Sequence, residues 1–170
     1  MADLLTHVLV AYVLLTVVGW RVEAVDARWR AVGMGGAAIP DLGKVSLLVD
    51  GRTVEGVLGV PFSYGPLSTL TGVVLVSGVI AVAFGRRYRR RAFAFLLVGG
   101  VASLLGDALR LTVNGRAGPL LYPLSWRRPP APGLYVSSDP RVLAFVLVAA
   151  VATYAVDRRL DRTGETEPTA

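Results

Sequence analysis

The stretch AFAFLLVGGVASLLGDALRLTV, residues 92–113, decides the fold class of this chain. Its first part, Ala92–Gly106, has no charged side chain, and the apolar pattern continues past Asp107 and Arg110 to Val113. At about 1.5 Å per residue, such a segment can cross the hydrocarbon core of a bilayer, which takes roughly 20 residues. We therefore expect a transmembrane helix here.

Four further apolar segments flank this one. Three of them contain no Asp, Glu, Lys or Arg, and the fourth is apolar in its second half and should end at a proline, which cannot continue a helix. The sequence thus predicts an all-α protein, an integral membrane bundle of about five helices joined by two outer loops. The four segments are Leu4–Trp20, Asp26–Pro40, Leu67–Phe84 and Val142–Val156.

The composition agrees with a membrane protein. Of the 170 residues, 54% are hydrophobic and 18% are charged, with a mean hydropathy of +0.57, whereas soluble domains are roughly 45–50% apolar and about 25% charged. The absence of Cys excludes disulfides and thiolate-bound metals, and the single His excludes a site that needs two imidazoles. The length suits one domain, placed at residues 1–157 and followed by a polar, disordered tail at 158–170.

Arginine clusters set the expected orientation. With five passes and the N-terminus outside, all three clusters and the C-terminus face the cytoplasm, as the positive-inside rule requires. This accounts for the net charge of +6 without nucleic acid, so the expected partner is the lipid bilayer of the plasma membrane. The clusters are Arg21, Arg28 and Arg30; Arg86, Arg87, Arg89, Arg90 and Arg91; and Arg158, Arg159 and Arg162.

Two loops then lie on the outer side. Residues 41–65 space their apolar side chains as a short amphipathic segment does, and this predicts a piece that lies on the surface of the bundle or membrane. Residues 114–140 are rich in proline and aromatic side chains, which suits an irregular segment at the membrane interface.

The topology places polar residues of four helices in one layer near the outer leaflet. His7 lies one turn into the first helix, and Asp107 lies about 9 Å below the outer end of the fourth. Ser103 precedes Asp107 by four residues and shares its helix face. Asp41 caps the second helix, and Ser68 and Thr69 open the third. Ionisable groups inside membrane helices are costly and usually functional, so this layer is the candidate site.

One imidazole and two carboxylates can serve as the protein ligands of a divalent metal ion. His7, Asp41 and Asp107 suit Zn²⁺, Mn²⁺ or Fe²⁺, and a water activated by such an ion can attack an ester or an amide. Ser68 or Ser103 could add a weak ligand or orient that water. Structural roles fit the same residues: a hydrogen-bonded histidine, a turn aspartate, an ion pair of Asp107 three residues from an arginine, and small packing serines.

Five short motifs in this order carry a resemblance to a known family. The chain resembles the membrane-bound metal-dependent hydrolases, the YdjM-like inner-membrane proteins, in the form common in haloarchaea, over about residues 1–157. The motifs are Asp3-Leu4-Leu5-Thr6-His7, Ile39-Pro40-Asp41-Leu42, Pro61-Phe62-Ser63-Tyr64-Gly65-Pro66-Leu67-Ser68-Thr69-Leu70, Ala102-Ser103-Leu104-Leu105-Gly106-Asp107 and Leu121-Tyr122-Pro123-Leu124.

The resemblance implies ligand roles for three of these residues. His7 matches the family's histidine in the first helix, Asp41 the aspartate of its Pro-Asp turn, and Asp107 the aspartate of its fourth helix. Two positions that are histidine in the family are Ser68 and Ser103 here. The implied activity is hydrolysis of a lipid or another hydrophobic ester or amide with a divalent metal.

Three other functions remain open at this point. A member with serines for histidines could bind no metal and act as a membrane interaction or scaffold protein. Alternatively, Ser103 or Ser68 could be the nucleophile of an intramembrane serine hydrolase, with His7 as base and Asp107 orienting it. A transporter or channel is the last alternative, although the sequence shows no inverted repeat.

Overall fold

The computed structural model describes residues 2–136 and 139–164, and every regular element in this part of the chain is helical. The β-type pairings found there are two isolated bridges, so the all-α prediction is confirmed for these residues. In chain order the elements are α1 Ala2–Gly19, α2 Ala27–Ala37, the 3₁₀ helix η1 Pro40–Leu47, α3 Gly51–Leu58, the 3₁₀ helix η2 Gly65–Ser68, α4 Leu70–Val82, α5 Arg89–Leu109 and α6 Pro140–Gly164.

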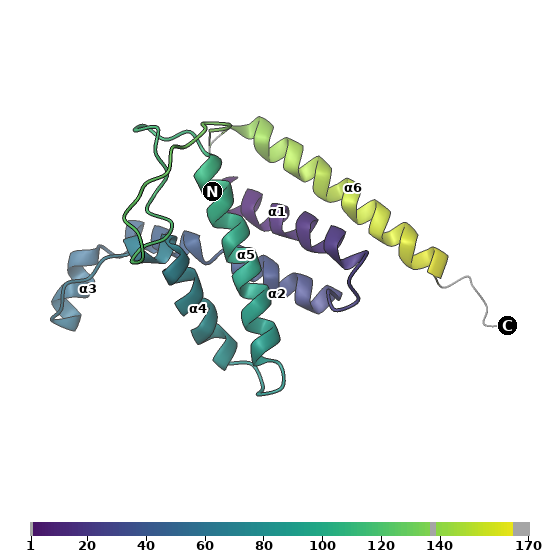
Figure 1. Cartoon of the computed structure of the whole chain (residues 1–170), viewed down its shortest axis with the longest axis horizontal. Helices are drawn as coiled ribbons and strands as arrows, with labels where there is room; N and C mark the ends of the chain where they lie inside the picture. The colour runs from purple at the N-terminus through teal and green to yellow at the C-terminus, as the bar shows by residue number, and fades with distance from the viewer. Residues whose placement is uncertain (1, 137–138, 165–170) are drawn as a thin grey trace.

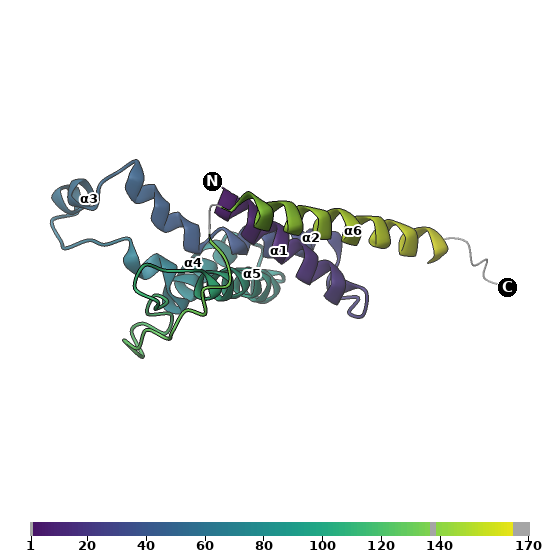
Figure 2. The same cartoon turned by 90° about the horizontal axis from the view of Figure 1, so that it is seen from above.

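Helix α5 is the centre of the bundle. It packs against α4 on one side and against α1 and α2 on the other, and α6 packs along α1 (Figure 1). Seen from above, α3 and η1 extend away from these helices (Figure 2). Helix α3 has no buried residue, as expected for an amphipathic segment at a surface.

Glycines bring the backbones of α2 and α5 into direct contact. A Cβ at Gly99 would overlap the carbonyl oxygen of Gly33, and a Cβ at Gly36 would overlap the backbone of Leu96. Small residues are what permits helices to approach this closely. The adjoining core is apolar and is drawn from α4, α5 and the residue before η1; it consists of Ile39, Val73, Leu96 and Leu104.

The helix ends follow local sequence signals. Asp26 caps α2 by accepting a hydrogen bond from the backbone N–H of Trp29 at 3.0 Å, and Thr69 caps α4 by accepting one from Gly72 at 3.3 Å. Pro40 follows the end of α2 and opens η1, so the predicted break at this proline is confirmed.

Two helices of the described residues are long and apolar enough to span a bilayer, namely Arg89–Leu109 and Pro140–Leu160. Only 33% and 17% of their most apolar windows are buried within the molecule, whereas the core helix of a soluble protein is mostly buried. Helices α1 and α4 are apolar but shorter, and α2 has 11 residues. The two long helices indicate association with a membrane.

The fourth apolar helix is shorter than predicted. The sequence suggests that it continues to Val113, but α5 ends at Leu109. The returning loop takes over the backbone hydrogen bonds there: Leu111 N–H donates to the carbonyl of Tyr135 at 2.8 Å, and Leu134 N–H donates to the carbonyl of Leu109 at 2.9 Å. The predicted depth of Asp107 is therefore wrong, since this residue lies in the last turn of α5.

Two smaller predictions about helix ends also change. Asp41 does not cap α2, because the chain tightens into η1 at Pro40 and Asp41 is the second residue of that 3₁₀ helix. Ser68 does not open α4 but ends η2, and Thr69 is the cap. Toward the C-terminus, α6 continues through 158–164, so that part of the expected tail is helical, and residues 165–170 lie outside the described residues.

Polar contacts join α6 to the rest of the bundle near its C-terminal end. Asp157 accepts a hydrogen bond from the indole N–H of Trp20 at 3.0 Å and one from the guanidinium of Arg30 at 2.6 Å. Arg91 of α5 donates to the carbonyl oxygen of Ala24 in the α1–α2 turn. The ends of α1 and α6 and the starts of α2 and α5 therefore lie at one end of the bundle.

We predict that Gly99→Ala destabilises the protein by about 1–3 kcal/mol, because the new methyl group meets the α2 backbone. Gly35→Ala is the matched control: a Cβ there has no other atom within 4 Å, and alanine gains up to about 1 kcal/mol of helix propensity. Thermal unfolding of both variants in detergent measures the difference. Equal melting temperatures would refute the close α2–α5 contact.

Candidate functional site

The centre of the candidate site is a buried contact between α1 and α5. Ser103 Oγ lies 2.9 Å from His7 Nδ1, and the two residues are 1% and 4% exposed. His7 Nε2 lies 3.8 Å from Asp107 Oδ1 and has no hydrogen-bond partner. Because Ser103 and Asp107 are four residues apart on α5, they reach the two nitrogens of one imidazole ring.

The contact with Ser103 determines what His7 Nε2 can do. When Nδ1–H donates to the serine oxygen, the Nε2 lone pair is free and faces Asp107. Ser103 therefore orients the ring. A serine nucleophile must touch its substrate, whereas Ser103 is 1% exposed, so this geometry favours the positioning role for Ser103.

The proline-rich loop and Gly106 pack beside the contact between His7 and Ser103. A Cβ at Gly106 would lie 3.3 Å from His7 Nε2, so glycine allows the ring to sit against α5. The hydroxyl of Tyr135 donates to the carbonyl oxygen of Gly106 at 2.9 Å. The loop thus covers the end of α5 next to the histidine.

Asp107 connects the buried contact to a cavity of about 450 Å³. Its side chain is 25% exposed, and its Oδ1 lies 3.5 Å from the guanidinium of Arg110. The cavity is bounded by η1, η2, the end of α5 and the loop after it. Its lining includes Asp41, Lys44, Tyr64, Ser68, Leu104, Asp107, Arg110 and Leu120.

Asp41 and Ser68 face the same cavity from the 3₁₀ helices. Asp41 Oδ1 lies 2.6 Å from Lys44 Nζ, whereas Asp41 Oδ2 is buried without a hydrogen-bond partner. Ser68 donates a hydrogen bond to the carbonyl oxygen of Pro40 at 3.0 Å, which joins η2 to η1 directly beside Asp41.

The structure thus divides the predicted site residues into two groups that share Asp107. His7, Ser103 and Asp107 are in contact, and Asp41, Ser68 and Asp107 line one cavity. Among the described side chains, those of residues 4–136 and 139–160, no three of His, Asp or Glu gather closely enough to hold one ion. The predicted set of three ligands is therefore not assembled in this conformation.

Sequence reasoning missed two cationic residues and one tyrosine at this site. Lys44 is detectable as the residue three positions after Asp41, the spacing of an ion pair on a helical turn. Arg110 is predicted from its spacing as an ion-pair partner of Asp107, which the structure confirms, and it also lines the cavity. Tyr135 reaches Gly106 from a distant loop, and no local pattern signals that contact.

The donor atoms fit a divalent ion in part. Two ligands that each lie about 2.1 Å from one ion are about 3–4 Å apart, and His7 Nε2 and Asp107 Oδ1 are separated by 3.8 Å. Both Nε2 of His7 and Oδ2 of Asp41 are buried atoms that lack a hydrogen-bond partner. Two protein ligands are thus in position, and a third carboxylate lies in the adjoining cavity.

Comparison of the chain with protein-family models, with curated proteins and with solved structures finds no match. Membership of the metal-dependent hydrolase family therefore stays a prediction that rests on the five sequence motifs.

We predict that Ser103→Ala lowers the free energy of unfolding by about 1–3 kcal/mol, because the buried Nδ1 of His7 loses its partner. Ser77→Ala is the matched control, since Ser77 is 0% exposed and its Oγ has no hydrogen-bond partner. The free energy of unfolding of both variants, measured in detergent, tests this prediction. An equal effect of the two substitutions would show that the Ser103–His7 contact contributes nothing.

Proposed function

We propose that this chain is a multi-pass membrane protein of the membrane-bound metal-dependent hydrolase type. Its site would bind a divalent cation, Zn²⁺, Mn²⁺ or Fe²⁺, and hydrolyse a lipid or another hydrophobic ester or amide near the outer leaflet. The ordered sequence motifs support the family, and the arrangement around His7 supports the cation site.

The proposal rests on the burial of His7 Nε2 and on its lack of a hydrogen-bond partner. This nitrogen is buried, has no hydrogen-bond partner and lies 3.8 Å from a carboxylate oxygen of Asp107. A buried polar atom without a partner costs about 1–3 kcal/mol, so such an atom calls for an explanation. A cation between the imidazole and the carboxylate would satisfy both groups.

His7 and Asp107 would hold the ion, and Asp41 would approach it from η1. When bound, a divalent ion supplies a Lewis acid that activates water at neutral pH. With Nδ1–H donating to its hydroxyl oxygen, Ser103 would hold the His7 ring in the tautomer that leaves Nε2 free. The hydroxyl acts through the ring and not on the substrate, which is the usual task of groups behind a metal ligand.

The cavity beside Asp107 offers both charge and apolar surface to a substrate. Lys44 and Arg110 supply cationic groups that can bind the carbonyl or phosphate oxygens of a lipid headgroup. Leu104 and Leu120 add apolar walls. An amphiphilic ester or amide matches this combination better than a fully polar molecule does.

The proposal places the chain in the plasma membrane with five passes, the N-terminus outside and the C-terminus in the cytoplasm. Contacts between Arg30 and Asp157 and between Arg91 and Ala24 gather the arginine-rich segments at one end of the bundle. The candidate site lies toward the opposite end of α5. The positive-inside rule then supports a cytoplasmic arginine-rich end and an outer site.

A scaffold protein without metal is the second candidate. It is favoured by the cationic partners that both carboxylates already have, Lys44 at 2.6 Å from Asp41 and Arg110 at 3.5 Å from Asp107. In that case the polar residues would hold η1, η2 and α5 together and form a surface for a membrane partner.

Metal content separates the two candidates. We predict about one Zn, Mn or Fe ion per chain in tag-free protein purified in detergent without chelators, measured by mass spectrometry. His7→Ala and Asp107→Asn should each lower the metal content at least tenfold, because each removes one of two positioned ligands. Asp50→Asn, which removes a carboxylate that does not line the cavity, is the matched control.

Wild-type protein that stays metal-free after incubation with each of these ions would exclude the hydrolase and favour the scaffold. Ions that remain bound to folded His7→Ala and Asp107→Asn proteins would show that the metal lies elsewhere.

A further inference from the structure

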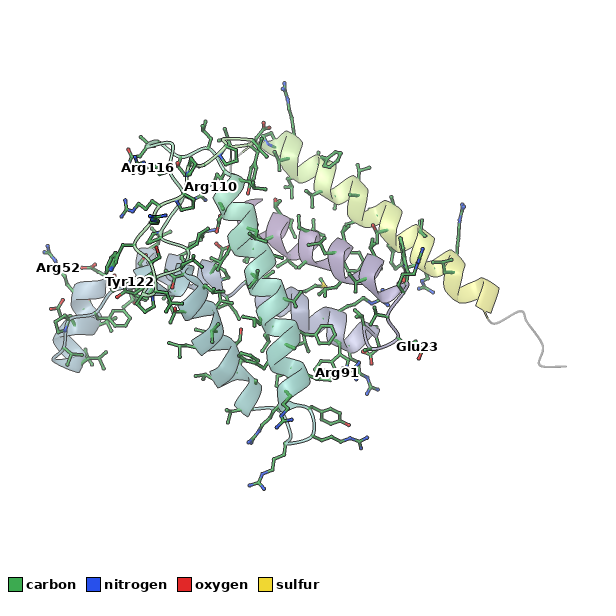
Figure 3. All side chains as sticks on the ribbon, in the orientation of Figure 1. Glu23, Arg52, Arg91, Arg110, Arg116 and Tyr122 are labelled. Atoms are coloured by element: carbon green, nitrogen blue, oxygen red, sulfur yellow. The ribbon has the colours of Figure 1, made fainter. Side chains whose placement is uncertain are left out.

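A second cavity lies at the arginine-rich end of the bundle. It has a volume of about 330 Å³ and is formed between the start of α2 and the connection from α4 to α5. Figure 3 shows Arg91 at this end of the molecule, opposite Arg110 and Arg116. The lining consists of Asp26, Arg28, Trp29, Val32, Phe84, Tyr88 and Arg91.

One wall of this cavity is a rigid stack of an arginine on aromatic rings. The Arg91 guanidinium lies 4.7 Å from the centre of the Trp29 ring, and Trp29 stacks on Phe95 with 5.5 Å between ring centres. Arg91 also donates to the carbonyl of Ala24. These contacts fix the guanidinium in place, and aromatic rings with arginine are typical of the interface between membrane and water.

The lining of the cavity carries one net positive charge, from Arg28 and Arg91 against Asp26. Arg28 makes no ion pair within the described residues, and the same holds for three exposed arginines of the α4–α5 connection, Arg86, Arg87 and Arg90. Asp26 is the carboxylate in the lining; its Oδ1 caps α2 and its Oδ2 lies 3.9 Å from Arg91. A net positive site therefore remains, and it suits an anion.

Helix α4, which leads to the cavity, carries exposed apolar side chains. Val79 and Val82 are 74% and 61% exposed on this helix, and Phe84, just beyond its end, lines the cavity. This end of the molecule thus has guanidinium groups that match a phosphate, and α4 has an exposed apolar surface that matches an acyl chain.

We infer that this cavity binds the headgroup of an anionic phospholipid. Arg28 and Arg91 receive the phosphate, Trp29 and Tyr88 flank the glycerol region, and the acyl chains lie along the exposed face of α4. Basic pockets between membrane helices are known to bind anionic lipid headgroups in this way. The inference is independent of the metal site, because the two cavities share no residue.

The test is native mass spectrometry of the full chain in detergent, with added phosphatidylglycerol or phosphatidylcholine of identical acyl chains. The wild type should bind one phosphatidylglycerol in a saturable manner, about tenfold more tightly than phosphatidylcholine. Arg28→Gln/Arg91→Gln should weaken phosphatidylglycerol binding at least tenfold. Arg28→Gln alone should weaken it about fivefold and keep the melting temperature, since Arg28 is exposed and makes no ion pair with the part of the chain that the structure describes.

Arg127→Gln/Arg128→Gln is the control for charge, because it removes two exposed arginines that do not line this cavity. It should leave phosphatidylglycerol binding unchanged within twofold. Equal affinity for the two lipids, or an equal loss in the control, would overturn the inference. Tighter binding of a single-stranded oligonucleotide than of phosphatidylglycerol would overturn it as well.

Discussion

The contact between the backbones of α2 and α5 is the constraint on which the rest of the structure depends. Glycines at Gly33, Gly36 and Gly99 let two helices meet with no side chain between them. Ile39, between α2 and η1, then enters the core that also contains Leu104 of α5. Because α2 packs so closely on α5, η1 begins near the end of α5. The cavity between them is therefore lined by a carboxylate from η1 and a carboxylate from α5.

The two ends of α5 lie beside cavities with different polar side chains. At the start of the helix, arginines and aromatic rings surround a cavity that has one carboxylate in its lining. At its end, two carboxylates and two cationic side chains line a larger cavity, and one of these carboxylates, Asp107, faces the buried imidazole of His7. Such a division is expected of a helix that crosses a bilayer, because the two interfaces differ in charge and the centre tolerates few ionised groups.

Much of the helical layout could be predicted from the sequence, because apolar runs and prolines act locally. The apolar core of α5, the Asp26 cap and the break at Pro40 all follow from neighbouring residues. The end of α5 could not be predicted, since Tyr135 and Leu134 supply the competing hydrogen bonds from far along the chain. Within the site, the shared face of Ser103 and Asp107 follows from spacing, whereas the ring nitrogen that Ser103 contacts depends on how α1 packs on α5.

The central claim is that Ser103 holds His7 so that Nε2 is free to bind a cation beside Asp107. Because His7 is the single histidine, ¹⁵N NMR of tag-free, histidine-labelled protein in detergent reports on one imidazole. The account predicts a proton on Nδ1 and a shift of the Nε2 resonance when Zn²⁺ is added. A proton on Nε2, with no change on adding Zn²⁺, would contradict it.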